Sequence, residues 1–294
     1  MTTTPRRRVV LYYPERGDPR LGEPYSADLF PLDFLHICAP AMQEGFEFDI
    51  IDSMVEPNPM EKLWEKLEGA WAFGSTCIVG YQVADGAEVS RLVREKHPGL
   101  PIIWGGWFPS VAPELFLRNN LADAVCLGQG EVTFTEWLCA VRDGKPVEAV
   151  RGLALWREGK LFKTPPREVV ALDDLPPPRF DLIDVDKYLD VQERQAGTAK
   201  VRYRFPDPPG YSMDKPYRAV SYFSSYGCPE PCSFCCSPLV TNRRWKALNA
   251  KTLVDRLKRS SRSTTSTWCA SRTPTSACTR SASRSSAACS SSAA

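Results

Sequence analysis

Short apolar runs and amphipathic segments alternate along the first half of the chain. Apolar runs bounded by turn residues predict strands, and segments with apolar residues at helical spacing predict helices. Strands that alternate with helices form a parallel sheet covered on both faces. We therefore expect a doubly wound, Rossmann-like α/β domain over residues 8–145. Its strands are predicted at 8–14, 47–52, 71–80, 101–106 and 122–128, and its helices at 31–44, 59–69, 82–96 and 130–144.

Glycine residues gather at the ends of the later predicted strands, at Gly80, Gly105, Gly106, Gly128 and Gly130. Ligands of open α/β sheets bind outside the carboxyl ends of the strands, and glycine there lets the backbone approach a ligand closely. Any one of these glycines could equally serve an ordinary strand-to-helix turn. Because several strand ends share the feature, the pattern favours a ligand-binding face at this edge of the sheet.

The second half of the chain is divided by changes in composition. A hairpin is predicted at 150–175, followed by a proline-rich, acidic connector at 173–189 and an irregular polar loop at 194–216. A further strand at 218–225 and a helix at 249–259 then begin a second domain. The expected division of the chain is a tail at 1–7, the α/β domain at 8–145, the hairpin and linker at 146–216, the start of the second domain at 217–259, and a tail at 260–294.

The last segment, residues 260–294, contains only Ser, Thr, Ala, Arg, three Cys, one Trp and one Pro. A segment without Leu, Ile, Val or Phe cannot bury an apolar core, so we expect low-complexity, disordered chain. The change of composition is abrupt and interrupts an ordinary helix-and-loop pattern. Our hypothesis is that this tail is a shifted reading frame.

The bulk composition is that of a globular protein without a strong electrostatic bias. Of the 294 residues, 43% are hydrophobic and 11% aromatic, which is enough to build a core. The formal net charge of +2 gives no reason to expect a nucleic-acid partner. No apolar run approaches the length of about 18 residues that a membrane span needs. The first residues lack the apolar core of a signal peptide, so we expect a cytoplasmic protein.

Four of the eleven cysteines, Cys228, Cys232, Cys235 and Cys236, stand close together. Without an export signal, such a group favours a metal over a disulfide framework. The spacing Cys-x3-Cys-x2-Cys of the first three, with Phe234 before the last, suits an iron–sulfur cluster because thiolates are soft ligands. Three ligands on a four-iron cluster leave one iron open to S-adenosylmethionine. We therefore predict a [4Fe–4S] cluster on Cys228, Cys232 and Cys235.

Two alternatives use the same cysteines. All four could hold zinc, although the adjacent Cys235 and Cys236 make poor tetrahedral geometry and no second cysteine pair lies at zinc-ribbon distance. Cys236 could instead be a fourth cluster ligand, which would close the open iron and leave an electron-transfer centre. We interpret Cys236 as a buried neighbour of the cluster. The cysteines interpreted as packing residues of the first domain are Cys38, Cys77, Cys126 and Cys139.

Two parts of the chain resemble known domains. Residues 218–235, a strand that leads into the cysteine loop, resemble the start of a radical S-adenosylmethionine domain, and residues 8–145 resemble the cobalamin-binding domain found ahead of many such domains. The resemblance covers about residues 8–259. It rests on Gly80-Tyr81-Gln82, GGWFPSVAPE at 105–114, GQGEVTF at 128–134, LDDLPPPRFDLID at 172–184 and the cysteine loop.

The resemblance implies a fold and a set of cofactors. The fold would be a cobalamin-binding sheet followed by the start of an incomplete radical S-adenosylmethionine (β/α) barrel. The implied cofactors are the [4Fe–4S] cluster, S-adenosylmethionine and cobalamin. The glycine-rich strand ends would cradle cobalamin, Glu131 would hydrogen bond near it, and Phe234 would pack near the cluster or the adenine. The cofactor-binding residues implied are Gly80, Tyr81, Gln82, Gly105, Gly106, Gly128, Gly130, Glu131 and Phe234.

The chain departs from cobalamin proteins that ligate cobalt through histidine. Those proteins carry Asp-x-His-x-x-Gly after the first strand, and no such pattern is present. Of the two histidines, His36 lies in the first predicted helix and His97 precedes Pro98 at a helix end. We expect both to be structural or solvated, and no protein imidazole on cobalt.

The resemblance implies a radical S-adenosylmethionine enzyme, with methyl transfer to an unactivated carbon of a small-molecule substrate as the first hypothesis. A flavodoxin- or ferredoxin-type protein would donate electrons. A radical cyclisation or rearrangement is the nearest alternative. Two further hypotheses are a non-catalytic cobalamin-binding module and a truncated, inactive product, because the later barrel units are not recognisable. The sequence identifies neither the substrate nor a set of catalytic residues.

Overall fold

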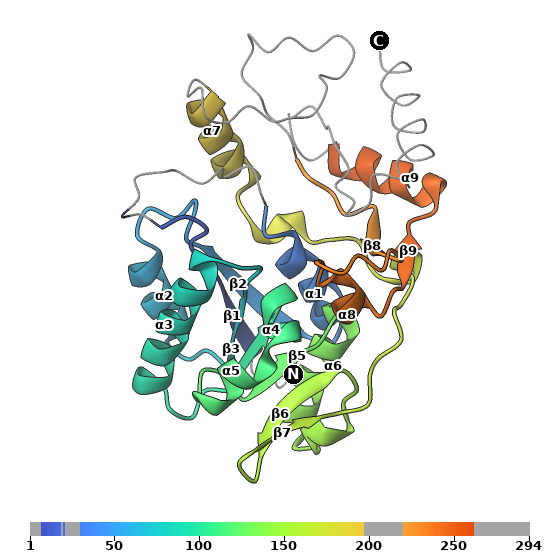
Figure 1. Cartoon of the computed structure of the whole chain (residues 1–294). Helices are drawn as coiled ribbons and strands as arrows, with labels where there is room; N and C mark the ends of the chain where they lie inside the picture. The colour runs from blue at the N-terminus through green and yellow to red at the C-terminus, as the bar shows by residue number, and fades with distance from the viewer. Residues whose placement is uncertain (1–6, 19, 21–29, 197–219, 262–294) are drawn as a thin grey trace, which may run out of the picture.

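A seven-stranded sheet forms the centre of the computed structural model, which describes residues 7–18, 20, 30–196 and 220–261 (Figure 1). The strands lie in the order β2-β1-β3-β4-β5-β6-β7. A hairpin of β6 (Leu153–Arg157) and β7 (Lys160–Lys163) continues the sheet antiparallel to β5. The parallel strands are β1 (Arg7–Tyr13), β2 (Phe46–Asp52), β3 (Ala72–Thr76), β4 (Ile102–Gly105) and β5 (Ala124–Cys126).

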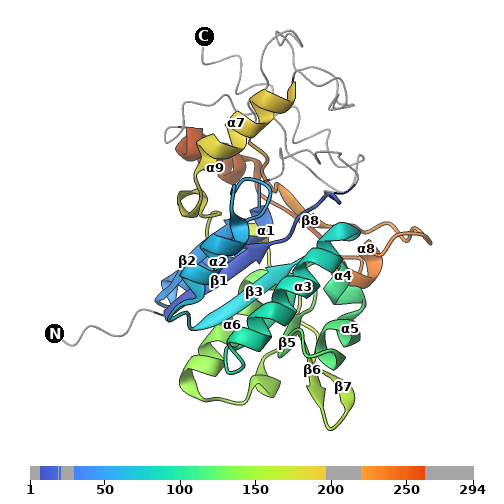
Figure 2. The ribbon, with the colours of Figure 1, turned by 90° about the vertical axis from the view of Figure 1, so that its left-hand side faces the viewer.

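Helices cover both faces of the sheet, as Figure 1 and Figure 2 show. Residues Val9 and Leu11 of β1 enter one core and Val10 and Tyr12 enter the other, because successive side chains of a strand point to opposite faces. The predicted doubly wound α/β fold is confirmed. The covering helices are α1 (Leu32–Gln43) and α6 (Gly130–Asp143) on one face, and α2 (Pro59–Leu67), α3 (Tyr81–Lys96) and α5 (Pro113–Arg118) on the other.

The strand order reverses direction between β1 and β3. From β1 the chain moves outward to β2, returns to β3 on the other side of β1, and continues to β4 and β5. Helices that leave adjacent strands toward opposite faces open a crevice at such a point, and ligands of open α/β sheets bind there. The fold therefore places a candidate site at the carboxyl ends of β1 and β3.

Close packing between α3 and β4 depends on Gly86. A Cβ atom at Gly86 would lie 2.5 Å from the Trp104 ring and 2.8 Å from the Pro14 ring. Trp104 is fully buried and donates from Nε1 to the Ser90 hydroxyl at 2.9 Å. The indole is therefore fixed by a hydrogen bond as well as by packing, and the helix approaches it without a side chain in between.

The structure contains short helices that the sequence patterns did not predict. Two short helices, α4 (Trp107–Val111) and α5, follow β4 where no helix was predicted. With five and six residues, neither is long enough to show a helical period. The predicted hairpin is present, and its pairing with β5 extends the sheet. The strand predicted at 71–80 is shorter in the structure, because the chain after Thr76 turns toward α3.

An additional helix, α7 (Val185–Ala196), begins in the connector predicted at 173–189 and ends inside the segment predicted as an irregular loop at 194–216, so the prediction is wrong for the first three residues of that loop. Its Tyr188 and Leu189 are buried against Phe30 and the amino-terminal part of α1. The Tyr188 ring stacks on Phe30 at 4.8 Å between centroids, and its hydroxyl donates to Asp52 Oδ2 at 3.0 Å. Burial raises the pKa of Asp52 to about 6, against the opposing charge of Arg16. The linker is thereby attached to the end of β2.

Residues 220–261, here called the cysteine segment, lie beyond the carboxyl ends of the parallel strands (Figure 1). The strand predicted at 218–225 overlaps β8 only at Ser225, because β8 begins there and ends at Gly227; β8 pairs antiparallel with β9. Residues 197–219 and 262–294 lie outside the described residues, and with them most of the loop predicted at 194–216 and nearly all of the low-complexity tail. The elements of the cysteine segment are β8 (Ser225–Gly227), α8 (Ser237–Thr241), β9 (Trp245–Ala247) and α9 (Ala250–Ser261).

The cysteine segment is packed on the linker through a small apolar cluster. Tyr222, Leu248 and Leu253 of the segment are buried against Leu172 and Leu175 of the linker. Asn249 opens α9, and its side chain accepts the Lys251 N–H at 2.9 Å, as expected of a helix cap. Among the helices that the structure describes, none is long and apolar enough to span a membrane.

Candidate functional site

A cavity of about 430 Å³ lies at the carboxyl ends of the parallel strands. Its floor is formed by the ends of β1 and β3, with Tyr13, Gly74 and Thr76, and by the turn after β4. The first turns of α1 and α6 supply one side. The cavity is therefore at the switch point that the strand order predicts.

The cysteine segment forms the opposite wall of this cavity. Phe223, Tyr226 and Gly227 line it from β8 and the chain before it, and Val240 lines it from α8. Ser221 and Ser225 lie on the same wall. Two stretches of chain separated by about a hundred residues thus enclose one space, with glycine-rich strand ends on one side and the approach to the cysteine loop on the other.

Four of the five predicted strand-end glycines line the cavity, and two of these four also allow close contacts within the chain. Gly105, Gly106, Gly128 and Gly130 all line the cavity, as expected. Two of them serve contacts within the chain: a Cβ at Gly106 would lie 2.5 Å from the Cys77 carbonyl, and one at Gly128 would lie 2.8 Å from the Val240 carbonyl. Both have positive φ angles, 98° and 73°, which glycine adopts without strain. Gly128 therefore lets the cysteine segment approach the sheet.

The strand-end loops are tied together by side chains of the predicted motifs. Ser110 donates its hydroxyl to the Gly106 carbonyl at 2.7 Å and accepts the Gly128 N–H at 3.1 Å, which joins the turns after β4 and β5. Gln129 pairs its amide with the backbone of Val170, accepting the N–H at 2.7 Å and donating to the carbonyl at 3.2 Å. These bonds hold the cavity edge in place without a ligand.

The predicted residues Gly80, Tyr81 and Gln82 do not line the cavity. Gly80 is exposed and precedes α3 with a φ of 72°. Gln82 is buried; its side chain accepts the Ile78 N–H at 3.1 Å and donates to the Pro14 carbonyl at 3.4 Å. This motif connects the turn after β3 to the chain after β1, and its cofactor role stays a prediction.

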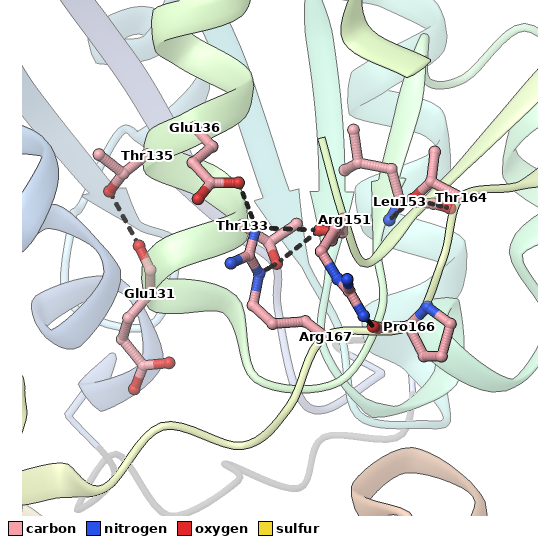
Figure 3. A network of polar contacts seen from close by, with 9 residues as sticks. All are labelled: Glu131, Thr133, Thr135, Glu136, Arg151, Leu153, Thr164, Pro166 and Arg167. Atoms are coloured by element: carbon pink, nitrogen blue, oxygen red, sulfur yellow. Dashed lines mark hydrogen bonds and ion pairs between the residues drawn. The ribbon is translucent and has the colours of Figure 1, made fainter. Parts of the chain in front are cut away.

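A polar network fixes the first turns of α6 (Figure 3). Arg167 donates from Nε to the Thr133 hydroxyl at 2.8 Å and forms an ion pair with Glu136. Thr133 in turn donates to the Arg151 carbonyl at 3.1 Å. The carboxyl of Glu131 lies apart from this network and points away from it in Figure 3. The network therefore anchors the helix and leaves Glu131 facing the cavity that it lines.

Two carboxyl groups line the cavity, one from α1 and one from α6, the two helices on the same face of the sheet. Asp33 of α1 accepts the Thr76 hydroxyl at 2.9 Å and the Phe34 N–H at 3.0 Å. Burial raises the pKa of Asp33, and these two donors and the Arg16 charge oppose the rise. Burial raises the pKa of Glu131 to about 7; backbone N–H groups oppose the rise and the charge of Asp33 adds to it. Asp33 has a side-chain donor and a nearby positive charge, whereas Glu131 has only backbone donors, so Asp33 loses its proton more easily than Glu131.

The cysteines of the loop differ in exposure. Cys228 is buried, whereas Cys232, Cys235 and Cys236 are exposed, so the interpretation of Cys236 as a buried neighbour is wrong. The Cys235 sulfur accepts the Ser237 N–H at 3.4 Å. Phe234 is 92% exposed and packs on no described aromatic ring. Among the described residues, no three Cys, His, Asp or Glu side chains converge in an arrangement that could hold a metal ion.

Comparison with known families identifies the sheet side of the cavity. Residues 21–138 match the model of the B12 binding domain. This part of the chain is similar to B12-binding domains and is called the B12-binding domain below. The matched residues run from before α1 into α6 and include β2 to β5, with the turns that line the cavity. The predicted resemblance to cobalamin-binding radical S-adenosylmethionine proteins is confirmed.

Curated relatives extend the likeness beyond the B12-binding domain. An uncharacterized methyltransferase of Pyrococcus horikoshii is 27% identical over 236 residues, which are 77% of this chain and 45% of the relative. The anaerobic magnesium-protoporphyrin IX monomethyl ester cyclase of Synechocystis is 24% identical over 235 residues, 78% of this chain and 42% of the relative. The chain thus spans less than half the length of these relatives.

A solved structure shows the same fold. The radical S-adenosylmethionine methyltransferase TsrM from Kitasatospora setae, with cobalamin and a [4Fe–4S] cluster bound, superposes with a TM-score of 0.60 at 18% identity. The match covers 88% of this chain and 46% of that one, so it extends well beyond the residues that match the B12 binding domain.

The walls of the cavity are mostly apolar, with few polar groups, which fits one face of a ring-shaped cofactor. Phe30, Phe34, Ile37 and Phe223 give it apolar walls. A Cβ at Gly105 would touch only the Cys126 Cβ, at 3.8 Å, so the end of β4 leaves open space where a side chain would otherwise stand. The chemistry and spacing of the three cysteines fit an iron–sulfur cluster, but their sulfur atoms as placed do not converge on one point.

Sequence reasoning missed several residues of the cavity wall. Asp33 is a carboxylate on an otherwise apolar helix, at the edge where the strands end, and that pattern could have indicated it. His36, expected to be structural or solvated, is buried, stacks on Phe223 at 5.6 Å and lines the cavity. Burial lowers its pKa to about 4, so it is neutral near pH 7. Tyr226 directly follows the strand predicted at 218–225, and only the folded chain brings it to the B12-binding domain.

Proposed function

We propose that this chain is the cobalamin- and cluster-binding part of a radical S-adenosylmethionine enzyme that transfers a methyl group to an unactivated carbon. One observation carries the proposal: the chain leading into the cysteine loop and the strand ends of the B12-binding domain line one cavity. Cofactors bound on the two walls would face each other. Relatives and structural neighbours that include methyltransferases support this reading.

The chain's own residues would hold cobalamin and exclude water. The open strand end at Gly105 leaves room for the ring, the turns at Gly106 and Gly130 line the same cavity, and Glu131 offers a polar contact. Apolar side chains such as Phe30 and Phe223 keep water from the reacting face. When bound, cobalamin supplies the methyl carrier, and the protein contributes positioning and exclusion of competing reactions.

Cys228, Cys232 and Cys235 would hold a [4Fe–4S] cluster that binds and cleaves S-adenosylmethionine. The loop must first change shape, because its sulfur atoms do not converge in this structure. Metal binding commonly organises its own ligands, since the free energy of binding is also free energy of folding. Phe234 would then cover the cluster or the adenine, and a flavodoxin- or ferredoxin-type protein would donate electrons.

A radical cyclisation is the second candidate. The likeness to the magnesium-protoporphyrin IX monomethyl ester cyclase covers as much of this chain as the likeness to the Pyrococcus methyltransferase. Both candidates require the same two cofactors and differ in the substrate and in the fate of its radical. A non-catalytic cobalamin-binding module would need only the sheet side of the cavity.

Anaerobic reconstitution with iron, sulfide and hydroxocobalamin, followed by reaction with S-adenosylmethionine and dithionite, separates these functions. The enzyme proposal expects about one cobalamin and four irons per chain and release of 5′-deoxyadenosine, methionine or a methylated product. Cobalamin binding without a cluster would support the binding module. Absence of cobalamin binding would contradict every function proposed here for the B12-binding domain.

A further inference from the structure

Asp33 and Glu131 are the acidic side chains that line the cavity among the described residues. They come from α1 and α6, the two helices of one face, and neither forms an ion pair with a described basic side chain. Two buried carboxyl groups beside one cavity are costly unless one is neutral or both meet a ligand. Their arrangement therefore requires an explanation beyond packing.

If only one of the two carboxyl groups is ionised, the hydrogen-bond partners indicate that it is Asp33. It accepts hydrogen bonds from the Thr76 hydroxyl and the Phe34 N–H, and the Arg16 charge favours its ionised form. The Glu131 carboxyl meets only backbone N–H groups, those of Gly130 and Glu131, and no described side chain donates to it; Glu131 is 8% exposed. The carboxyl without a side-chain donor is the one that keeps its proton.

Other groups near Glu131 do not alter this assignment. Cys126 of β5 and Tyr226 of β8 feel the Glu131 charge, and burial raises the pKa of both side chains, so they stay neutral. His36 lines the same cavity and is neutral near pH 7 because burial lowers its pKa to about 4. Asp33, which lines the same cavity, is thus the charged side chain that acts on Glu131.

We propose that Asp33 and Glu131 form a subsite for a primary carboxamide, with Glu131 as a protonated hydrogen-bond donor and Asp33 as an ionised acceptor. A carboxylic acid offers one O–H donor, and a carboxylate with two bonds retains free lone pairs. A carboxamide presents a carbonyl acceptor and two N–H donors, which match this pair. Cobalamin carries such carboxamides around its ring, so this inference rests on the proposed function.

The proposal predicts that cobalamin binding takes up a proton at alkaline pH. A donor that must be protonated weakens binding once the pH rises above its pKa in the free protein, and the weakening follows from linkage. With the pKa of Glu131 near 7, the dissociation constant should rise on the order of tenfold between pH 6 and pH 8.5. Glu131→Gln keeps a donor but cannot titrate, so its dissociation constant should be flat over this range.

The experiment is a titration of the full chain with hydroxocobalamin at pH 6 to 8.5, followed by absorbance and by calorimetry in buffers of different ionisation enthalpy. Glu65→Gln, at an exposed site on α2, is the control and should keep the wild-type pH dependence. A buffer-dependent heat at pH 8 that is absent from Glu131→Gln would support the proposal. Equal pH dependence in wild type and Glu131→Gln, with tight binding in both, would overturn it and leave the proposed function standing.

A second arm identifies the ligand group. Cobalamin monocarboxylates, in which one carboxamide is hydrolysed to a carboxylate, place a charge where Asp33 stands. Wild type should bind one of the isomers at least tenfold more weakly than cobalamin, and Asp33→Asn should lose that discrimination. Equal affinity for all isomers would contradict carboxamide recognition. Failure of wild type to bind cobalamin at any pH would instead contradict the proposed function, and the carboxamide subsite with it.

Discussion

The two walls of the cavity are built in different ways. The sheet side consists of buried strands and helices whose end loops are joined by Ser110 and Gln129. The cysteine segment has a two-stranded sheet of three-residue strands, and three of its four cysteines are exposed. The loops of the sheet side are joined to one another by hydrogen bonds. The cysteine segment has cysteines at the spacing of a cluster motif, but among the described residues their sulfur atoms do not converge.

This difference indicates how the two cofactors would be bound. Binding to a preformed cavity loses little conformational entropy, so the sheet side would bind cobalamin without first rearranging. A cysteine loop whose sulfur atoms do not converge must be organised by the metal that it binds. We therefore expect substitutions on the sheet side to change affinity or stability by graded amounts, and substitutions of the cysteines to remove the cluster altogether.

The largest effect is expected at the cysteine ligands. Cys228→Ser, Cys232→Ser or Cys235→Ser should each reduce the iron content of reconstituted protein by at least tenfold, because a cluster with two thiolate ligands is not retained. Cobalamin binding should persist in all three. Cys139→Ser, on α6 away from the cavity, is the control, and iron analysis with the visible absorption spectrum is the measurement. Full iron content in the three variants would remove the cluster from this loop.

Glu131 should give the next largest effect, on stability. Its folded pKa of about 7 lies above that of the unfolded chain, so its contribution to stability is present at acidic pH and is lost as the pH rises through about 7. Between pH 5 and pH 8, Glu131→Gln should gain roughly 2–3 kcal/mol relative to wild type. Urea unfolding of the apoprotein at several pH values tests this. Parallel pH profiles of the two proteins would show that the carboxyl is not desolvated.

Filling the open strand end should weaken cobalamin binding without unfolding the protein. Gly105→Leu places a side chain where a Cβ meets only Cys126, and we expect a roughly hundredfold loss of affinity, equivalent to about 2.7 kcal/mol. Gly99→Leu, where a Cβ meets nothing within 4 Å at the other end of the strands, is the matched control. Titration with hydroxocobalamin measures both, and unchanged affinity in Gly105→Leu would place the cofactor elsewhere.

A smaller effect should follow from overpacking of the sheet side. Gly86→Ala puts a methyl group against Trp104 and Pro14 and should cost about 1–2 kcal/mol net of the helix propensity that alanine gains. Gly99→Ala should change the free energy of unfolding by less than about 0.5 kcal/mol. Thermal and urea unfolding would distinguish them. A neutral Gly86→Ala would mean that α3 can shift away from the sheet.

The smallest effect is expected where the linker helix meets the sheet. Tyr188→Phe keeps the stack on Phe30 and removes the hydrogen bond to Asp52, which should cost about 1 kcal/mol. Loss of this donor should also raise the pKa of Asp52 further, since the bond lowers it. Hydrogen exchange of α7 amides, compared between the variant and wild type, would show the loosened contact. Unchanged exchange and stability would mean that packing alone holds the linker.

Sequence patterns predicted the sheet and its ligand edge because both have a local signature. Buried parallel strands appear as apolar runs, and turns at strand ends appear as glycines, so the positions of β1 to β5 and the role of Gly105 as a cavity residue could be predicted. The cysteine spacing is equally local. Short helices such as α4 lack a measurable period, and α7 was hidden in a proline-rich segment.

The rest of the site depends on distant contacts that no local pattern records. Gly128 was predicted to approach a ligand, and the contact that the structure shows there is with the Val240 carbonyl of the cysteine segment. Phe223 and Tyr226 line the cavity in a segment that packs on Leu172 and Leu175, far away in the sequence. Asp33 pairs with Thr76 across the space between α1 and β3, which a single sequence does not reveal.

Hydrogen exchange with and without hydroxocobalamin tests most directly whether both walls enclose one cofactor. The account predicts slower exchange on both sides of the cavity, in residues 104–107 and 127–131 on the sheet side and in residues 223–228 of the cysteine segment. The amino-terminal ends of the strands, near Leu100 and Asp123, should exchange as before. Protection confined to those ends, or to neither wall, would contradict the account.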